Sequence, residues 1–99
     1  MSLNSIANTS LAEACIEFEA GILDEQETVE FFQDLIDSGQ AWRMAGHYGR
    51  TAMLMISDGK CLLGPTGHHD AYGNYFPSRD EVQPGVPGSP DFVLNNLAA

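Results

Sequence analysis

The sequence predicts a small all-α fold, a bundle of about three short helices followed by an extended C-terminal segment rich in Pro and Gly. Apolar residues recur at helical spacing in three successive segments, each of which ends at a Gly. All five Pro residues follow Leu63, where they interrupt regular structure. We therefore expect an N-terminal extension over residues 1–9, a helical domain over residues 10–63 and a partly ordered tail over residues 64–99.

The first helix is expected to begin after Ser10. Ser10 and Glu13 have the spacing of a capping box, in which each side chain accepts a hydrogen bond from the other residue's backbone N–H group. Gly21 is placed to end the helix in a left-handed conformation. The apolar stripe of this helix is expected to comprise Leu11, Cys15, Phe18 and Ile22.

The second helix is the most strongly patterned segment. Asp24 is the expected N-cap, Glu27 stands three residues further on, and Gly39 ends the helix. The buried face is expected to comprise Val29, Phe32, Leu35 and Ile36, with Phe31 beside it. The opposite face then carries Glu30, Asp34 and Asp37.

The third helical segment is expected to follow a short turn over Ala41–Met44. Gly46 allows a sharp change of direction, and a helix then runs from His47 or Tyr48 to Asp58, where Gly59 closes it. The inward side chains are expected to be Tyr48, Ala52, Met55 and Ile56. Within the tail, the pattern predicts one further short helix that begins at Pro90.

The charge of the chain is strongly negative and unevenly distributed. The formal net charge is −10, and the segment from Glu13 to Asp37 holds nine acidic residues and no basic one. This charge argues against direct binding of nucleic acid or of an anionic membrane, because neutralising phosphates takes clustered Lys and Arg. The acidic residues either keep the chain soluble or dock on a basic protein surface. The candidate docking residues are Glu27, Glu30, Asp34 and Asp37.

Aromatic and basic residues gather in the segment from Trp42 to Ala52. In one interpretation, these side chains close the core and pair with the acidic helices. In the other, the N-terminus of the third helix offers unpaired N–H groups to an anion, such as the phosphate of a nucleotide or signal molecule. The segment matches neither a P-loop nor a dinucleotide fingerprint. The candidate ligand-binding residues are Trp42, His47, Tyr48, Arg50 and Thr51.

The sequence predicts no catalytic site, no metal site and no cofactor. Ser, His and Asp residues occur, but no nucleophile stands in a recognisable strand–turn–helix setting. His68, His69 and Asp70 are adjacent metal-ligating types. Neighbouring His side chains diverge, however, and a Gly-rich stretch provides no scaffold for the three or four ligands that zinc needs. We expect a solvated turn at this position.

Several features of the sequence predict a cytosolic protein. Cys15 and Cys61 lie far apart, as is typical of reduced thiols in a cytosolic protein. No apolar run approaches the roughly 20 residues of a membrane span. Residues 1–10 lack the charged and apolar regions of a signal peptide. We therefore expect no membrane partner.

Two motifs carry a resemblance to a known family. Glu27 to Gly39 reads E-T-x-x-F-F-Q-x-L-I-D-x-G, and Ala41 to Ala52 reads A-W-x-x-x-G-H-Y-G-R-T-A. With these motifs, residues 22–59 resemble a family of small proteins from tailed bacteriophages. The resemblance implies a phage protein in the host cell cytoplasm and gives no particular activity.

Three functions fit these observations. The leading hypothesis is a non-enzymatic phage accessory protein that binds a bacterial host protein, such as a defence or nucleic-acid-handling factor, and inhibits it through the acidic surface or the surface between Trp42 and Arg50. The second hypothesis is a protein that binds a small phosphorylated ligand through Gly46–Thr51. The third is a homo-oligomeric structural component.

Overall fold

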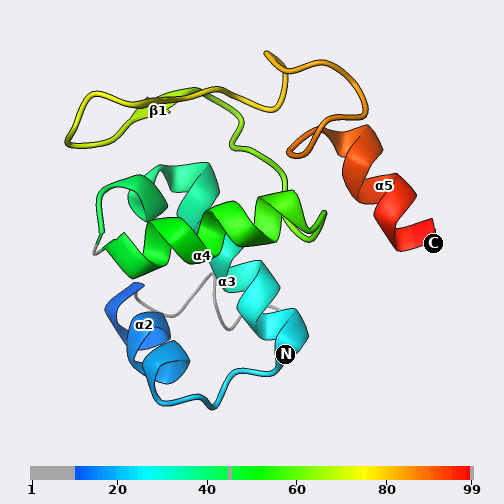
Figure 1. Ribbon diagram of the computed structural model, residues 1–99. Helices are drawn as coiled ribbons and strands as arrows, with labels where there is room; N and C mark the ends of the chain where they lie inside the picture. Colours follow the sequence, from blue (N-terminus) through cyan, green and yellow to red (C-terminus); the bar gives the residue numbers. More distant parts are fainter. Residues whose placement is uncertain (1–10, 45, 99) are drawn as a thin grey trace. The chain divides into compact units, whose positions relative to one another are not determined.

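The structure is a computed structural model that describes residues 11–44 and 46–98 (Figure 1). Within this part of the chain, four α-helices, one 3-10 helix and a two-stranded hairpin are present. The fold is therefore mostly helical, as expected, but it is not a pure three-helix bundle. The chain forms two compact units, residues 1–31 and 32–99. This division falls inside a helix.

The first unit contains α2, Leu11–Glu19, and the beginning of α3. The rings of Phe18 and Phe31 pack with their centroids 5.5 Å apart, and Phe31 is completely buried. The expectation that Ile22 joins the apolar stripe is wrong: α2 ends before it, and its side chain is exposed. The expected cap at Ser10 and the extension over residues 1–9 lie outside the described residues.

Helix α3, Glu25–Ser38, begins with the expected capping box. The backbone N–H of Glu27 donates to Asp24 Oδ1 at 2.7 Å, and the backbone N–H of Asp24 donates to Glu27 Oε1 at 3.0 Å. These two bonds satisfy donors that the helix itself leaves unpaired. The fully buried side chains of α3 are Phe31, Phe32, Leu35 and Ile36, whereas Val29 is half-buried.

The expected turn and third helix are both present in the second unit. The turn is the 3-10 helix η2, Gln40–Trp42, and the helix is α4, Gly46–Ser57. Tyr48, Ala52 and Ile56 of α4 are buried, and the Tyr48 ring packs on Phe32 with the centroids 6.1 Å apart. Gly49 brings α4 close to η2, because a Cβ atom at this position would lie only 3.4 Å from the Ala41 carbonyl oxygen.

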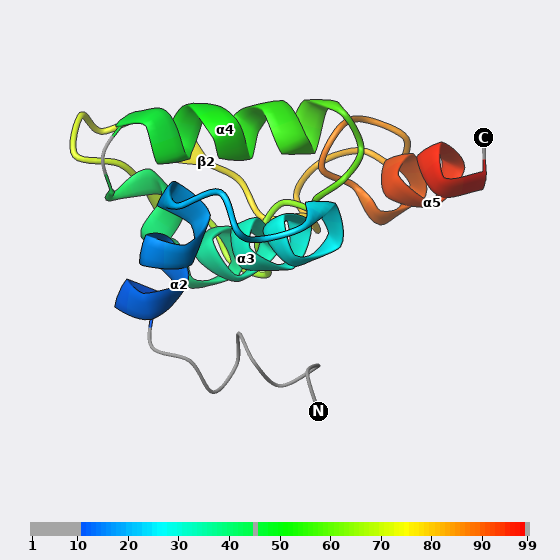
Figure 2. The same ribbon diagram turned by 90° about the horizontal axis from the view of Figure 1, so that it is seen from below.

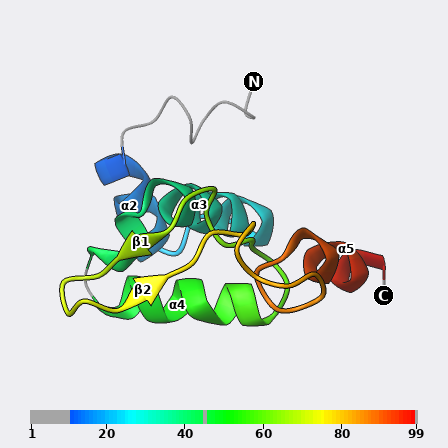
Figure 3. The same ribbon diagram turned by 90° about the horizontal axis from the view of Figure 1, so that it is seen from above.

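A hairpin that the sequence did not predict follows α4. Strands β1, His68–His69, and β2, Tyr75–Phe76, pair antiparallel, with His68 opposite Phe76 and His69 opposite Tyr75. The Phe76 ring stacks on Trp42 of η2, with the centroids 4.0 Å apart and the planes 3° from parallel. In the view of Figure 3, β2 points in roughly the direction of the α4 axis. The aromatic stack therefore attaches the hairpin to the helices.

Polar contacts hold the Pro/Gly-rich segment on the helices as well. The Arg79 guanidinium donates to Asp37 Oδ1 at 2.7 Å and to the Leu63 carbonyl oxygen at 2.8 Å. The Gln33 amide donates to the Leu62 carbonyl oxygen at 3.1 Å and accepts from the Leu62 N–H at 2.8 Å. Side chains of α3 thus bind this segment and the residues that lead into it.

The last helix, α5, Pro90–Ala98, starts where the sequence predicts. Ser89 precedes it, and its hydroxyl accepts hydrogen bonds from the N–H groups of Phe92 at 3.2 Å and Gly85 at 3.0 Å. A serine cap followed by Pro at the first helical position is a typical helix start. Helix α5 lies beyond the C-terminal end of α4 in all views (Figure 1, Figure 2 and Figure 3).

Candidate binding pocket

A pocket of about 830 Å³ opens in the second unit between η2, α4 and the turn of the hairpin. From η2 and the residues after it, the lining includes Trp42, Arg43 and Met44. Trp42 forms one wall with little of its surface exposed, because Phe76 covers one face of its ring. This stack fixes the wall and joins two segments that are distant in the sequence.

One face of α4 forms a second wall. The residues on this face recur three and four positions apart, as the helical period requires: Gly46, Gly49, Arg50, Met53, Leu54 and Ser57. Met53 is 42% exposed and Leu54 is 62% exposed. Helix α4 thus has two apolar faces, one that builds the core and one that lines the pocket.

The turn of the hairpin supplies the third wall. Asp70 shapes this turn, because its carboxylate accepts hydrogen bonds from the N–H groups of Tyr72 and Asn74, both at 2.9 Å, and from Asn74 Nδ2 at 3.0 Å. The turn presents Ala71 and Tyr72 to the pocket, and Tyr72 is 91% exposed. Asp70 therefore acts on the pocket chiefly by positioning its wall.

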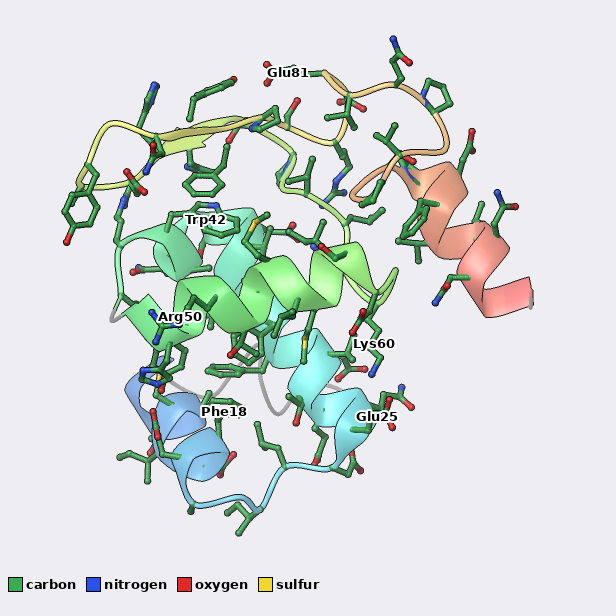
Figure 4. The ribbon with its side chains drawn as sticks, in the orientation of Figure 1. Phe18, Glu25, Trp42, Arg50, Lys60 and Glu81 are labelled. Carbon is green, nitrogen blue, oxygen red and sulfur yellow. The ribbon has the colours of Figure 1, made fainter. Side chains whose placement is uncertain are left out.

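Two of the chain's four basic residues, Arg43 and Arg50, also line the pocket. Trp42 lies beneath the hairpin, and Arg50 projects from the N-terminal part of α4 (Figure 4). Within residues 11–44 and 46–98, neither guanidinium forms an ion pair. The pocket thus combines an apolar lining with two cationic groups that have no internal carboxylate partner among the described residues.

The sequence of the chain matches one known protein family. A family model described as a domain of unknown function, DUF7417, matches residues 7–76. The chain belongs to the DUF7417 family. The matched segment includes every residue that lines the pocket and ends at Phe76, so it leaves out α5. No curated protein and no solved structure matches the chain.

Two of the five ligand-binding candidates, Trp42 and Arg50, line the pocket of this DUF7417 chain. The other three do not, and the helical period explains why. Tyr48 is buried in the core, and His47 packs its ring on Tyr48 with the centroids 4.2 Å apart. Thr51 is half-buried and lies outside the lining. Of the five candidates, Trp42 and Arg50 thus lie at the pocket, whereas Tyr48 belongs to the core.

Sequence reasoning missed most of the pocket-lining residues. The signal for Met53 and Leu54 is present, because they stand three and four residues after Arg50 and so extend its face of α4. Asp70, Tyr72 and Phe76 gave no such signal, since they join the site only through the fold of the hairpin. The sequence can thus predict one wall of the pocket.

The four acidic candidates of α3 do not form a uniform surface. Glu27 belongs to the capping box, and Asp37 binds both Arg79 and the Gln33 amide. Glu30 is exposed and accepts a hydrogen bond from Gln26 at 3.3 Å. Asp34 is exposed and also makes a contact within the chain. Asp37 therefore stabilises the fold. A substitution of Asp37 in a binding test would change the stability of the chain as well as any contact with a partner.

The remaining candidate groups have structural explanations. Burial raises the pKa of the Cys61 thiol to about 12, with the Asp37 charge adding to the shift and Lys60 opposing it, so this thiol is a poor nucleophile. Among the described residues, no group of three or more His, Cys, Asp or Glu side chains could hold a metal ion. In this part of the chain, no helix has the length and apolar character to cross a membrane.

Acidification is expected to loosen the turn that forms the third wall. The hydrogen bonds to Asp70, above all that from the Asn74 side chain, hold its pKa below the usual value. Because the folded pKa is the lower one, this stabilisation is complete above the unfolded pKa of about 3.9 and is lost as the pH falls through the folded pKa. An NMR titration of the Tyr72 and Asn74 amides measures the change.

The control for this titration is Asn74→Ala, which removes the largest contribution to the lowered pKa. We expect the Asp70 titration of this variant to move upward, toward that of an exposed aspartate. An Asp70 titration that is the same in both proteins would contradict the assigned hydrogen bonds.

Proposed function

We propose that this DUF7417 protein is a non-enzymatic accessory protein that acts by binding another protein through the pocket beside Trp42. The observation that carries the proposal is the exposure of Met53, Leu54 and Tyr72 around one concave site. Exposed apolar side chains that gather in one place mark interaction sites, because their burial against a partner is favourable. Flexible Met side chains also adapt well to a partner's surface.

The partner that we propose is a bacterial host protein, of the defence or nucleic-acid-handling kind, in the host cell cytoplasm. The resemblance to tailed-bacteriophage proteins supports the bacterial host. The net charge of −10 supports a partner with a basic surface, because opposite charges steer two proteins together and raise their association rate. In this account, Glu30, Asp34 and the other acids contribute to long-range attraction, and the pocket provides the close contact.

A second candidate function is the binding of a small phosphorylated ligand in the same pocket. The pocket volume of about 830 Å³ lies within the range of about 300–1,000 Å³ for small-molecule sites. Arg43 and Arg50 would supply the charge that a phosphate requires. This candidate predicts that an added nucleotide raises the melting temperature of the chain without any protein partner.

Capture from a bacterial lysate tests the leading proposal. The immobilised wild-type chain is compared with Met53→Asp in the pocket and Glu30→Gln on α3, and captured proteins are identified by mass spectrometry. We expect one protein to bind the wild type and Glu30→Gln but not Met53→Asp, since a carboxylate in the pocket opposes apolar contact.

Two measurements make the capture experiment decisive. Circular dichroism checks that Met53→Asp keeps its helices, so that loss of capture reports on the surface. Light scattering at several concentrations checks whether the chain covers its own pocket by self-association. Capture that survives Met53→Asp but fails in Glu30→Gln would contradict the pocket and favour the acidic face of α3.

A further inference from the structure

The charges around the pocket differ from those of the rest of the chain. The charged lining residues are Arg43, Arg50 and Asp70, so the formal charge of the lining is 2 − 1 = +1. The whole chain has a charge of −10. Asp70 does not neutralise the arginines by an ion pair, and its carboxylate already accepts three hydrogen bonds from Tyr72 and Asn74. The pocket is therefore a small cationic region on an acidic chain.

The cationic and apolar groups lie at the same site. Arg43 and Arg50 are exposed, and the apolar surface between the walls is provided mainly by the exposed parts of Met53, Leu54 and Tyr72. A complementary ligand therefore has an apolar group that enters the pocket and an anionic group beside it. Arginine suits this contact, because its planar guanidinium binds a carboxylate through two parallel hydrogen bonds.

The lining favours a peptide over a nucleotide or a nucleic acid. Trp42 is only 7% exposed, and Phe76 covers one face of its ring, so it provides little surface on which a base could stack. A polyphosphate would extend beyond the two arginines. Its outer phosphates would then be repelled by the negative charge of the chain. A peptide carboxylate is a smaller anion. At physiological ionic strength, it feels mainly the charges within about 8 Å, which is the Debye length.

We infer that the pocket binds a peptide segment in which large apolar side chains are flanked by carboxylates, with Arg43 and Arg50 pairing with the carboxylates. This inference rests on the proposed function and specifies the part of the partner that enters the pocket. Long-range attraction to a basic partner is compatible with it, because the arginines act only at short range. The selectivity of the pocket for acidic over basic segments comes from these two residues.

Trp42 provides the test, because it is the only Trp of the chain and lines the pocket. Its fluorescence is followed while the full chain is titrated with a capped tetrapeptide that has phenylalanine and leucine at its centre and one glutamate on each side. We expect this peptide to bind about 10-fold more tightly than the same peptide with lysines, because like charges then oppose each other. A third peptide, with alanines at the centre, is expected not to bind.

Two single substitutions show whether the arginines provide the selectivity. Arg50→Gln is expected to weaken binding of the glutamate peptide by about 3- to 5-fold, which is the usual contribution of an exposed ion pair. Lys60→Gln removes one exposed base outside the pocket and is expected to leave the affinity unchanged. Melting curves of both variants check that each is folded.

The outcomes separate the inference from the proposed function. Equal binding of the glutamate and lysine peptides, or no saturable binding of either, would overturn the inference, while loss of lysate capture in Met53→Asp would still support the proposed function. Arg50-dependent binding of ATP in place of the peptide would also overturn it and would favour the small-ligand function. If both Met53→Asp and the wild type capture the same protein, the proposed function fails as well.

Discussion

Phe32→Ala is expected to remove a large part of the stability of the second unit. The Phe32 side chain is completely buried and packs against Tyr48, which belongs to α4. Truncating a buried Phe to Ala costs about 3–5 kcal/mol, through lost apolar burial and the cavity that remains. A natural domain has only about 5–15 kcal/mol of stability, so a large fall in the melting temperature should follow.

Met53→Ala is the matched control for this substitution. Met53 also lies on an apolar face of a helix, but that face lines the pocket, and its side chain is 42% exposed. We expect the free energy of unfolding to change by less than about 1 kcal/mol. Urea denaturation followed by circular dichroism measures both variants. Equal losses in Phe32→Ala and Met53→Ala would contradict the assignment of core and pocket faces.

The helices were predictable because their signals are local. The capping box of Asp24 and Glu27, the period of the apolar residues in α3 and α4, and Pro90 at the start of α5 all lie within a few residues of the elements that they specify. The error at Ile22 arose because the stripe was extended past the end of α2. Local patterns thus give the helices and most of their buried faces.

The hairpin was not predictable in the same way, because distant residues hold it. Arg79 binds Asp37 from 42 positions away, and Phe76 stacks on Trp42. The strands have only two residues each, too few to show an alternating pattern. Composition alone therefore gave no signal for the hairpin within the partly ordered tail that it predicted.

The candidate site shows the same difference between local and distant signals. Trp42 and Arg50 were identified from the sequence, since aromatic and basic residues are conspicuous in an acidic chain. The helical period places Arg50 and Tyr48 on different faces of α4, and this division is not apparent when the motif is read along the chain. The wall around Tyr72 depends on the hairpin and was therefore outside the reach of sequence reasoning.

Leu54→Asp is expected to produce the largest loss of binding. Leu54 is 62% exposed on the pocket face of α4, and a partner that fills the pocket must cover it. Side chains at the centre of an interface often contribute more than 2 kcal/mol, which corresponds to a loss of affinity of about 30-fold or more. The carboxylate that the substitution introduces adds to this loss, because the partner would bury it without a charge or hydrogen bond to compensate.

Helix α5 offers a closely matched control. Leu94 is 63% exposed, lies outside the pocket and follows the segment that the family model matches. Leu94→Asp therefore makes the same chemical change at the same exposure, and it should leave the affinity for the partner within about 2-fold of the wild type, as distant surface substitutions do. Both variants are expected to keep their helical circular dichroism.

The dissociation constants of Leu54→Asp and Leu94→Asp for the protein captured from lysate provide the most direct test of the pocket as a binding surface. We predict a loss of about 30-fold or more for Leu54→Asp and almost none for Leu94→Asp. Equal dissociation constants for the two variants, or a loss confined to Leu94→Asp, would show that the partner binds elsewhere on the molecule.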